Sequence, residues 1–179
     1  MKEVIVFLFS LFSVVTSLAV GCPSNVEVCF TPGQHCTEKI VESINDAKHQ
    51  LLVQAYSFTS APIAKAIINA HRRGIDVQII LDKSQISQRY SSATFFENQK
   101  IPLWVDYKVA IAHNKVIIID SSRTIGGSFN YSKAAQTKNA ENVLFIDSAC
   151  LAQQFEQNWK KRQAVSTPIE LYRENHKKV

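Results

Sequence analysis

The chain has 179 residues, of which 46% are hydrophobic and 20% are charged, a composition typical of a globular protein. This composition excludes a disordered tail, and five Gly and five Pro exclude a collagen-like or low-complexity chain. The length predicts one domain, and the formal net charge is +5. We therefore begin from a single α/β or α+β domain.

An uncharged apolar segment, Val4 to Gly21, opens the chain. It is shorter than the ~20 apolar residues that usually span a bilayer. The small residues Ser17 and Ala19 fit a signal peptidase site. We therefore predict that residues 1–21 are an export signal, which gives a secreted or periplasmic protein. The alternatives are an uncleaved N-terminal anchor and a lipoprotein anchor at Cys22, because residues 19–22 resemble a lipoprotein cleavage box.

Cysteine spacing predicts one disulfide. Cys29 and Cys36 enclose a Pro32-Gly33 turn that can bring their ends together. A loop this short contributes roughly 2–3 kcal/mol in the chain-entropy model. A metal site that uses His35 competes with this reading, but the spacing is not a usual one for zinc. We expect Cys150 to be a buried thiol.

The first half of the chain alternates strands and helices. Apolar residues in periods of two or about four predict strands at 26–30, 51–58 and 75–81, with helices at 37–48 and 60–74. Such a βαβαβ start favours parallel pairing and an α/β fold.

The second half reads as shorter strands followed by a helix. Residues 83–98 predict a helix with an exposed loop. We predict further strands at 103–107, 109–120, 124–129 and 142–146, a loop or short helix at 131–138, and a final helix carrying Leu151, Phe155 and Trp159. From Asn158 onward six bases face two acids, which is +4 of the net charge. This basic tail suits an anionic membrane surface or nucleic acid, although a solvated helix has the same composition.

One cluster of polar residues stands out. His113 and Lys115 lie two apart on the predicted strand 109–120, so their side chains point to the same face. The apolar run 116–119 indicates burial on both faces. The two side chains therefore lie where the buried strand becomes polar.

These residue types suit the hydrolysis of a phosphodiester. An imidazole can attack phosphorus and form a covalent phosphoryl intermediate. Donors such as Lys115, Ser128 and Asn130 can neutralise charge on the phosphate oxygens. A carboxylate should orient the imidazole through its other ring nitrogen. Glu141 is the candidate, and Asp120 either serves that role instead or holds the hairpin.

From His113 to Asn130 the chain resembles the phospholipase D superfamily, because it matches H-x-K-x4-D-x6-G-S-x-N without a gap. The resemblance extends over nearly all of residues 25–165, including the segments 54–58 and 134–142. It is strongest to small single-motif bacterial members, which include a secreted endonuclease and small exported phospholipases D.

The resemblance implies a mixed β-sheet flanked by helices in one domain, residues 22–179, and a phosphohydrolase without metal or cofactor. Most superfamily members bring two motifs to one site, whereas this chain has one. The resemblance therefore implies a homodimer with one shared active site. It also assigns roles to six residues: His113 as nucleophile, Lys115, Ser128 and Asn130 as phosphate ligands, Glu141 as the group that positions His113, and Asp120 as a supporting residue.

We therefore expect an exported phosphodiesterase that acts through a phosphohistidine. A phospholipase D that converts phosphatidylcholine to phosphatidate and choline is slightly favoured as its function. A non-specific endonuclease that cleaves DNA or RNA by the same mechanism is the first alternative. A non-catalytic protein that binds nucleic acid or membrane is the second, and the unsubstituted motif disfavours it.

Overall fold

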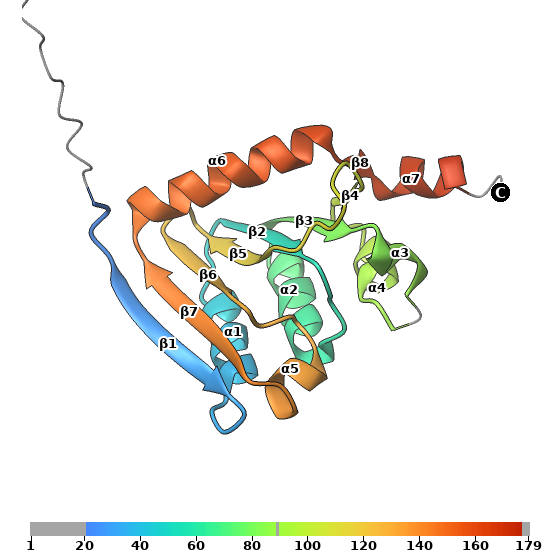
Figure 1. Ribbon diagram of the computed structural model, residues 1–179. Helices are drawn as coiled ribbons and strands as arrows, with labels where there is room; N and C mark the ends of the chain where they lie inside the picture. The colour runs from blue at the N-terminus through green and yellow to red at the C-terminus, as the bar shows by residue number, and fades with distance from the viewer. Residues whose placement is uncertain (1–20, 89, 177–179) are drawn as a thin grey trace, which may run out of the picture.

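The computed structural model describes residues 21–88 and 90–176, which form a mixed β-sheet with helices on both faces (Figure 1). The elements in chain order are β1 (Asn25–Thr31), α1 (Cys36–Asn45), β2 (Gln50–Ala55), α2 (Ala61–Arg72), β3 (Asp76–Asp82), α3 (Ser84–Ser87), α4 (Ala93–Asn98), β4 (Leu103–Asp106), β5 (Lys115–Ile119), β6 (Arg123–Gly127), α5 (Lys133–Thr137), β7 (Glu141–Asp147), α6 (Ala149–Val165), β8 (Thr167–Pro168) and α7 (Ile169–His176). The strand order is β1-β7-β6-β5-β2-β3-β4-β8. The predicted α/β fold with a mixed sheet is confirmed.

The two halves of the sheet are connected differently. Strands β2, β3 and β4 are parallel neighbours, as the alternating pattern predicted. Strands β5, β6 and β7 form an antiparallel meander, and β1 pairs antiparallel with β7 at the edge of the sheet. The prediction that β1 belongs to a parallel βαβαβ unit was therefore wrong, because the meander separates β1 from β2.

Helices bury the two faces of the sheet unequally. On one face, α1 and α2 contribute fully buried isoleucines to the large core, such as Ile40, Ile44 and Ile67. On the other face, α6 crosses β2, β4, β5 and β6 (Figure 1). Its Trp159 is 2% exposed, and the indole nitrogen donates to the carbonyl of Val53 at 2.9 Å. Such a donor partner makes the burial of a large ring favourable.

The long strand predicted at 109–120 was wrong in its first half, because β5 begins only at Lys115. Side chains hold the preceding loop in place of a strand partner. The carboxylate of Asp82 accepts from the N–H of Ala112 at 2.7 Å, and Lys83 donates to the carbonyl of Val109 at 3.2 Å. The backbone groups of the loop form hydrogen bonds with these side chains and need no neighbouring strand. The apolar pattern of the loop residues does not show this, so it did not reveal where the strand starts.

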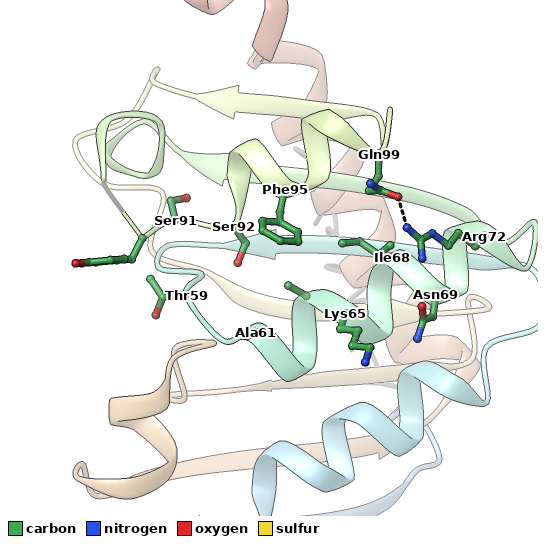
Figure 2. A pocket seen from close by; sticks show the side chains of 12 residues that line it. Thr59, Ala61, Lys65, Ile68, Asn69, Arg72, Ser91, Ser92, Phe95 and Gln99 are labelled. Carbon is green, nitrogen blue, oxygen red and sulfur yellow. Dashed lines mark hydrogen bonds between the residues drawn. The ribbon is translucent and has the colours of Figure 1, made fainter.

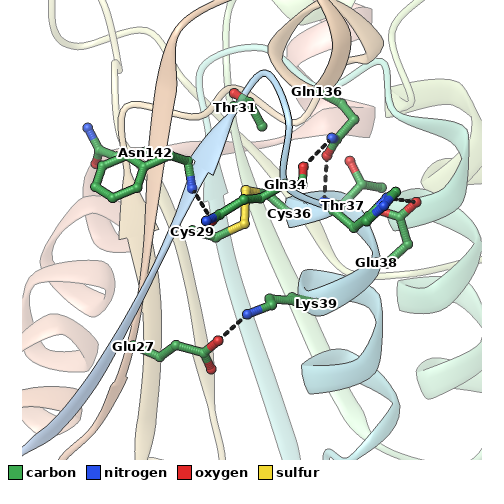
Figure 3. Close-up of a disulfide and its surroundings, with 12 residues drawn as sticks. Glu27, Cys29, Thr31, Gln34, Cys36, Thr37, Glu38, Lys39, Gln136 and Asn142 are labelled. Carbon is green, nitrogen blue, oxygen red and sulfur yellow. Dashed lines mark hydrogen bonds and ion pairs between the residues drawn. A yellow bond between two sulfur atoms is a disulfide. The ribbon is translucent and has the colours of Figure 1, made fainter.

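The Cys29–Cys36 disulfide is present, as predicted, and it joins β1 to the start of α1 (Figure 3). Both cysteines are fully buried. The side chain of Gln136 braces this corner, because it donates to the carbonyl of Gln34 and accepts from the N–H of Thr37, each at 2.8 Å. The disulfide joins the two ends of this turn, and Gln136 ties the turn to α5.

The prediction of a buried thiol at Cys150 was wrong, because Cys150 forms a second disulfide with Cys22. The cause is the register of the sheet edge. Asn25 of β1 pairs with Asp147 of β7, so the residues before β1 and after β7 meet at one end of the sheet. The predicted export signal falls almost wholly on residues 1–20, outside the described residues. Within the described part of the chain, no helix is long and apolar enough to cross a membrane.

Candidate active site

The predicted site residues gather at one end of the strands of the sheet, with one exception described below. Lys115 opens β5, Ser128 follows β6, and Glu141 opens β7. Because these three strands are antiparallel neighbours, the start of β5, the end of β6 and the start of β7 lie at the same end of the sheet. β2 also ends here, since Ala55 pairs with Lys115.

His113 and Lys115 form a tight pair. The Nζ atom of Lys115 lies 3.0 Å from Nδ1 and 3.1 Å from Nε2 of His113, and it donates to the carbonyl of His113 at 2.8 Å. An ammonium group can donate to a ring nitrogen only where that nitrogen carries no proton. Which of the two ring nitrogens accepts depends on the tautomer of His113.

Tyr56 is a site residue to which sequence analysis gave no role. Its ring lies over His113 with centroids 4.6 Å apart, and the Nζ atom of Lys115 is 5.3 Å from the same ring. The N–H of Tyr56 donates to the carbonyl of Asn114 at 2.9 Å. This bond ties the end of β2 to the residue between His113 and Lys115. In the sequence, Tyr56 fell within the strand predicted at 51–58 and within the segment 54–58 that shares the family resemblance, whereas β2 ends at Ala55.

Lys115 is 6% exposed, and this burial lowers the pKa of its ammonium group, although the charge of Glu141 partly opposes the shift. Burial disfavours the charged form because the surroundings solvate it less well than water. A phosphate placed at this end of the sheet would supply the missing negative charge. Lys115 is therefore suited to bind an anion.

The carboxylate of Glu141 contacts Ser128 and Asn139. The hydroxyl of Ser128 donates to Glu141 at 2.6 Å and accepts from the N–H of Asn142 at 3.1 Å. The side chain of Asn139 donates to the second oxygen of Glu141 at 3.0 Å. Among the described residues, no hydrogen bond or ion pair joins Glu141 to His113. In the single chain, the expected positioning of His113 by Glu141 is therefore not formed, and the carboxylate orients Ser128.

Gly127 gives this arrangement its shape. Its φ is +145°, and a Cβ atom there would lie 2.4 Å from the carbonyl oxygen of Asn142. Only glycine tolerates both the conformation and the close approach. Asn130, three residues later, has a buried side-chain oxygen without a hydrogen-bond partner in the described chain. This oxygen can only accept a hydrogen bond, so a contact with a phosphate oxygen would use the side-chain NH₂ group of Asn130.

Asp120 is the exception, because it lies at the opposite end of β5 from Lys115. Its carboxylate accepts from the backbone N–H groups of residues 48–50 at 2.8 to 2.9 Å. Burial raises the pKa of Asp120, but these three hydrogen bonds outweigh it and lower the pKa overall. Asp120 and Ser121 have φ of 51° and 49°, as in a type I′ turn. Of the two roles left open for Asp120, the structure supports holding the hairpin.

Comparisons with known proteins agree with the motif and the geometry. The family model described as "Cardiolipin synthase, PLD-like domain" matches residues 40–163. A phospholipase D of Rickettsia prowazekii is 42% identical over 146 residues, which are 82% of this chain and 71% of the relative.

Solved structures agree in fold. Nuc from Salmonella typhimurium, a phospholipase D family member, has a TM-score of 0.77 and 36% identity, covering 82% of this chain and 98% of Nuc. NucT from Helicobacter pylori has a TM-score of 0.74 and 26% identity, covering 82% and 99%. The chain therefore belongs to the phospholipase D family, and it is a phosphoric diester hydrolase of that family.

Proposed function

We propose that the protein is an exported phospholipase D that cleaves phospholipids through a covalent phosphohistidine on His113. The observation that carries this proposal is the His113–Lys115 pair, in which a nucleophilic ring lies 3.0 Å from a buried cation. Enzymes place cations in this way where negative charge develops on a transferring phosphoryl group.

The reaction proceeds in two displacements. A ring nitrogen of His113 attacks phosphorus, the P–N bond forms, and the bond to the leaving alcohol breaks while an acid protonates its oxygen. Water then attacks phosphorus and loses a proton to the same group, and the P–N bond breaks. Lys115, Asn130 and the hydroxyl of Ser128 bind the phosphate oxygens. Ser128 must turn its proton from Glu141 toward the substrate to do so.

A second imidazole is the natural acid and base, and we place it on a second copy of the chain. The chain has five histidines, and no hydrogen bond or ring contact joins His113 to another one within residues 21–88 and 90–176. The proposed homodimer brings both His113 side chains to one phosphate across a two-fold axis.

An exposed apolar surface beside the site suits this dimer. Val26, Val28 and Phe30 alternate along β1 and are 52%, 41% and 53% exposed. They lie on the face opposite the buried Cys29, and α6 does not extend across this edge of the sheet (Figure 1). Phe30 pairs with Asn142, whose N–H donates to Ser128. A partner that covers this surface would therefore reach the site.

Phospholipid is favoured as substrate by the similarity to the rickettsial phospholipase D over 82% of this chain. We take phosphatidylcholine, cleaved to phosphatidate and choline, as the reference substrate. The basic C-terminal tail would add attraction to an anionic membrane. Part of that tail is paired, because Arg162 binds Asp106 and Arg173 binds Glu97.

The two disulfides support export, since disulfides persist in oxidising compartments. The Cys22–Cys150 bond also bears on the lipoprotein alternative. Lipidation at Cys22 would use the sulfur that this disulfide requires, so a single chain can carry one or the other.

The test compares choline release from phosphatidylcholine vesicles with cleavage of plasmid DNA, both in excess EDTA and with His113→Asn as control. The proposal expects choline release that persists in EDTA and is absent in the variant. Cleavage of DNA without choline release would support the endonuclease alternative. Loss of activity in EDTA that zinc or magnesium restores would contradict the covalent-histidine mechanism.

A further inference from the structure

An apolar groove runs between α2 and α4, on the face of the sheet away from α6 (Figure 2). Its volume is about 430 Å³. Ala64 and Ile68 of α2 form its floor and are 5% and 6% exposed, while Phe95 of α4 forms the opposite wall. The proposed mechanism does not use this groove.

Two aromatic side chains beside the groove are exposed to solvent. Phe95 is 66% exposed, and Tyr90, in the loop before α4, is 75% exposed. Single exposed apolar residues are common, but two aromatic residues beside one apolar groove indicate a ligand or an interface.

One end of the groove adjoins the active site. Thr59 lines the groove, and its N–H donates to the carbonyl of Tyr131 at 2.8 Å. Tyr131 directly follows Asn130, and Thr59 lies three residues after Tyr56, whose ring covers His113. Thr59 therefore links the mouth of the groove to the segment that carries Asn130, whereas His113 lines a separate hollow with Asn158 and Arg162 of α6.

At the other end of the groove, two lining side chains contact each other. Arg72, in the last turn of α2, donates to the side chain of Gln99 at 2.8 Å (Figure 2). From Ala61 to Arg72, α2 runs for about 16 Å. One leaflet of a bilayer core is roughly 15 Å deep, half of its full thickness. An acyl chain that lies along α2 would therefore extend over about the length of this helix.

We propose that the groove between α2 and α4 binds an acyl chain of the phospholipid substrate. This inference rests on the proposed function, and it adds that the enzyme recognises the lipid portion of its substrate as well as the phosphodiester. Lys65 and Arg72 also line the groove, and Arg72 donates to Gln99. We favour an acyl chain over a nucleic acid because Ala64, Ile68 and Phe95 make the lining mainly apolar. With the chain in the groove, the enzyme takes one lipid out of the bilayer.

The test measures kcat/KM on monomeric dibutanoyl and diheptanoyl phosphatidylcholine, each below its critical micelle concentration, and on bis(p-nitrophenyl) phosphate. Each buried methylene multiplies affinity by roughly four. We therefore expect wild type to prefer the longer lipid by at least about tenfold. Monomeric lipids separate binding of a chain in the groove from adsorption to a membrane.

Two variants alter the groove in opposite ways. Phe95→Ser removes its wall at an exposed position, and Ala64→Leu fills its floor. Both should reduce the preference for diheptanoyl lipid to about twofold, while activity on bis(p-nitrophenyl) phosphate and dibutanoyl lipid stays within twofold of wild type. Leu171→Ser is the matched control, because Leu171 is 52% exposed on α7, outside the groove, and the preference should persist.

The following results would overturn the inference. Chain-length preference that both variants retain would show that the groove does not bind the chain. Equal losses on all three substrates would show that the variants do not act through binding of the chain. Loss of plasmid cleavage, measured in parallel, with the lipid preference retained would assign the groove to nucleic acid. If wild type cleaves bis(p-nitrophenyl) phosphate but neither lipid, the proposed lipid substrate fails as well. If wild type cleaves both lipids equally, only the groove assignment fails.

Discussion

The two ends of β5 carry residues of one sequence motif in different surroundings. At one end, Lys115 is buried beside His113, and Ser128 and Asn130 lie on the adjoining strand end. At the other end, three backbone N–H groups occupy the carboxylate of Asp120. The carboxylate of Asp120 is bonded to backbone and therefore holds a turn. The ammonium group of Lys115 lies at the end of the sheet where a substrate can bind. The fixed spacing of the motif therefore joins the end of β5 for which we propose a catalytic role to an end that holds a turn.

The largest expected effect is that of His113→Asn. The change removes the nucleophile and keeps a side chain of similar polarity, so we expect activity to fall by at least about 10⁴-fold. The melting temperature should stay within about 2 °C of wild type, because His113 is exposed. Activity within tenfold of wild type would place the chemistry elsewhere.

Lys115→Met should cost about 10²- to 10³-fold in kcat, because the variant keeps the stem and removes the cation that binds the phosphate. Since burial lowers the pKa of Lys115, the folded protein pays to keep that group charged. The variant should therefore unfold at the same temperature as wild type or a higher one at pH 7. A lower melting temperature together with unchanged activity per folded molecule would assign Lys115 to structure.

Mixing subunits tests whether the catalytic end is shared between two chains. Wild type and His113→Asn protein are exchanged at equal concentrations, and activity is compared with that of wild type alone at the same total protein concentration. If both imidazoles are required, about a quarter of the activity should remain, the square of the wild-type fraction. Retention of half, or an active monomer in sedimentation, would show that each chain works alone.

Asp120→Asn should affect stability and leave chemistry unchanged. The loss of charge-assisted hydrogen bonds should cost about 1–2 kcal/mol in unfolding free energy, or roughly 2–8 °C in Tm. Activity per folded molecule should stay within about twofold.

The effect of Asp120→Asn should also depend on pH. Because the pKa of Asp120 is lower in the folded chain than in the unfolded chain, its contribution is complete above about pH 4 and is lost as pH falls through the lowered value. Urea unfolding at pH 7 and pH 3 should therefore show a smaller difference between the two proteins at pH 3. A difference that grows on acidification would contradict this account.

Sequence analysis predicted features with local causes. The Cys29–Cys36 bond spans a short turn, and α2 follows from its periodicity and from Pro62 in its first turn. The fixed spacing of the motif also brought His113, Lys115 and Ser128 into one prediction before any geometry was known.

Features that depend on contacts distant in sequence were missed. The Cys22–Cys150 bond depends on the pairing of β1 with β7, which no local pattern encodes. The binding of Ser128 by Glu141 depends on the close approach of β6 to Asn142 at Gly127. Residues 109–112 read as part of a strand because they are apolar, while Asp82, whose side chain accepts from Ala112, lies 30 residues before it.

The most direct test of the central claim is to identify the residue that carries the covalent intermediate. The enzyme is mixed with bis(p-nitrophenyl) phosphate, quenched in alkali within one turnover so that a P–N bond survives, and digested for peptide mass analysis. The account predicts a p-nitrophenylphosphoryl group on His113 in wild type and none in His113→Asn. An adduct on any other residue, or no adduct at any time during turnover, would contradict it.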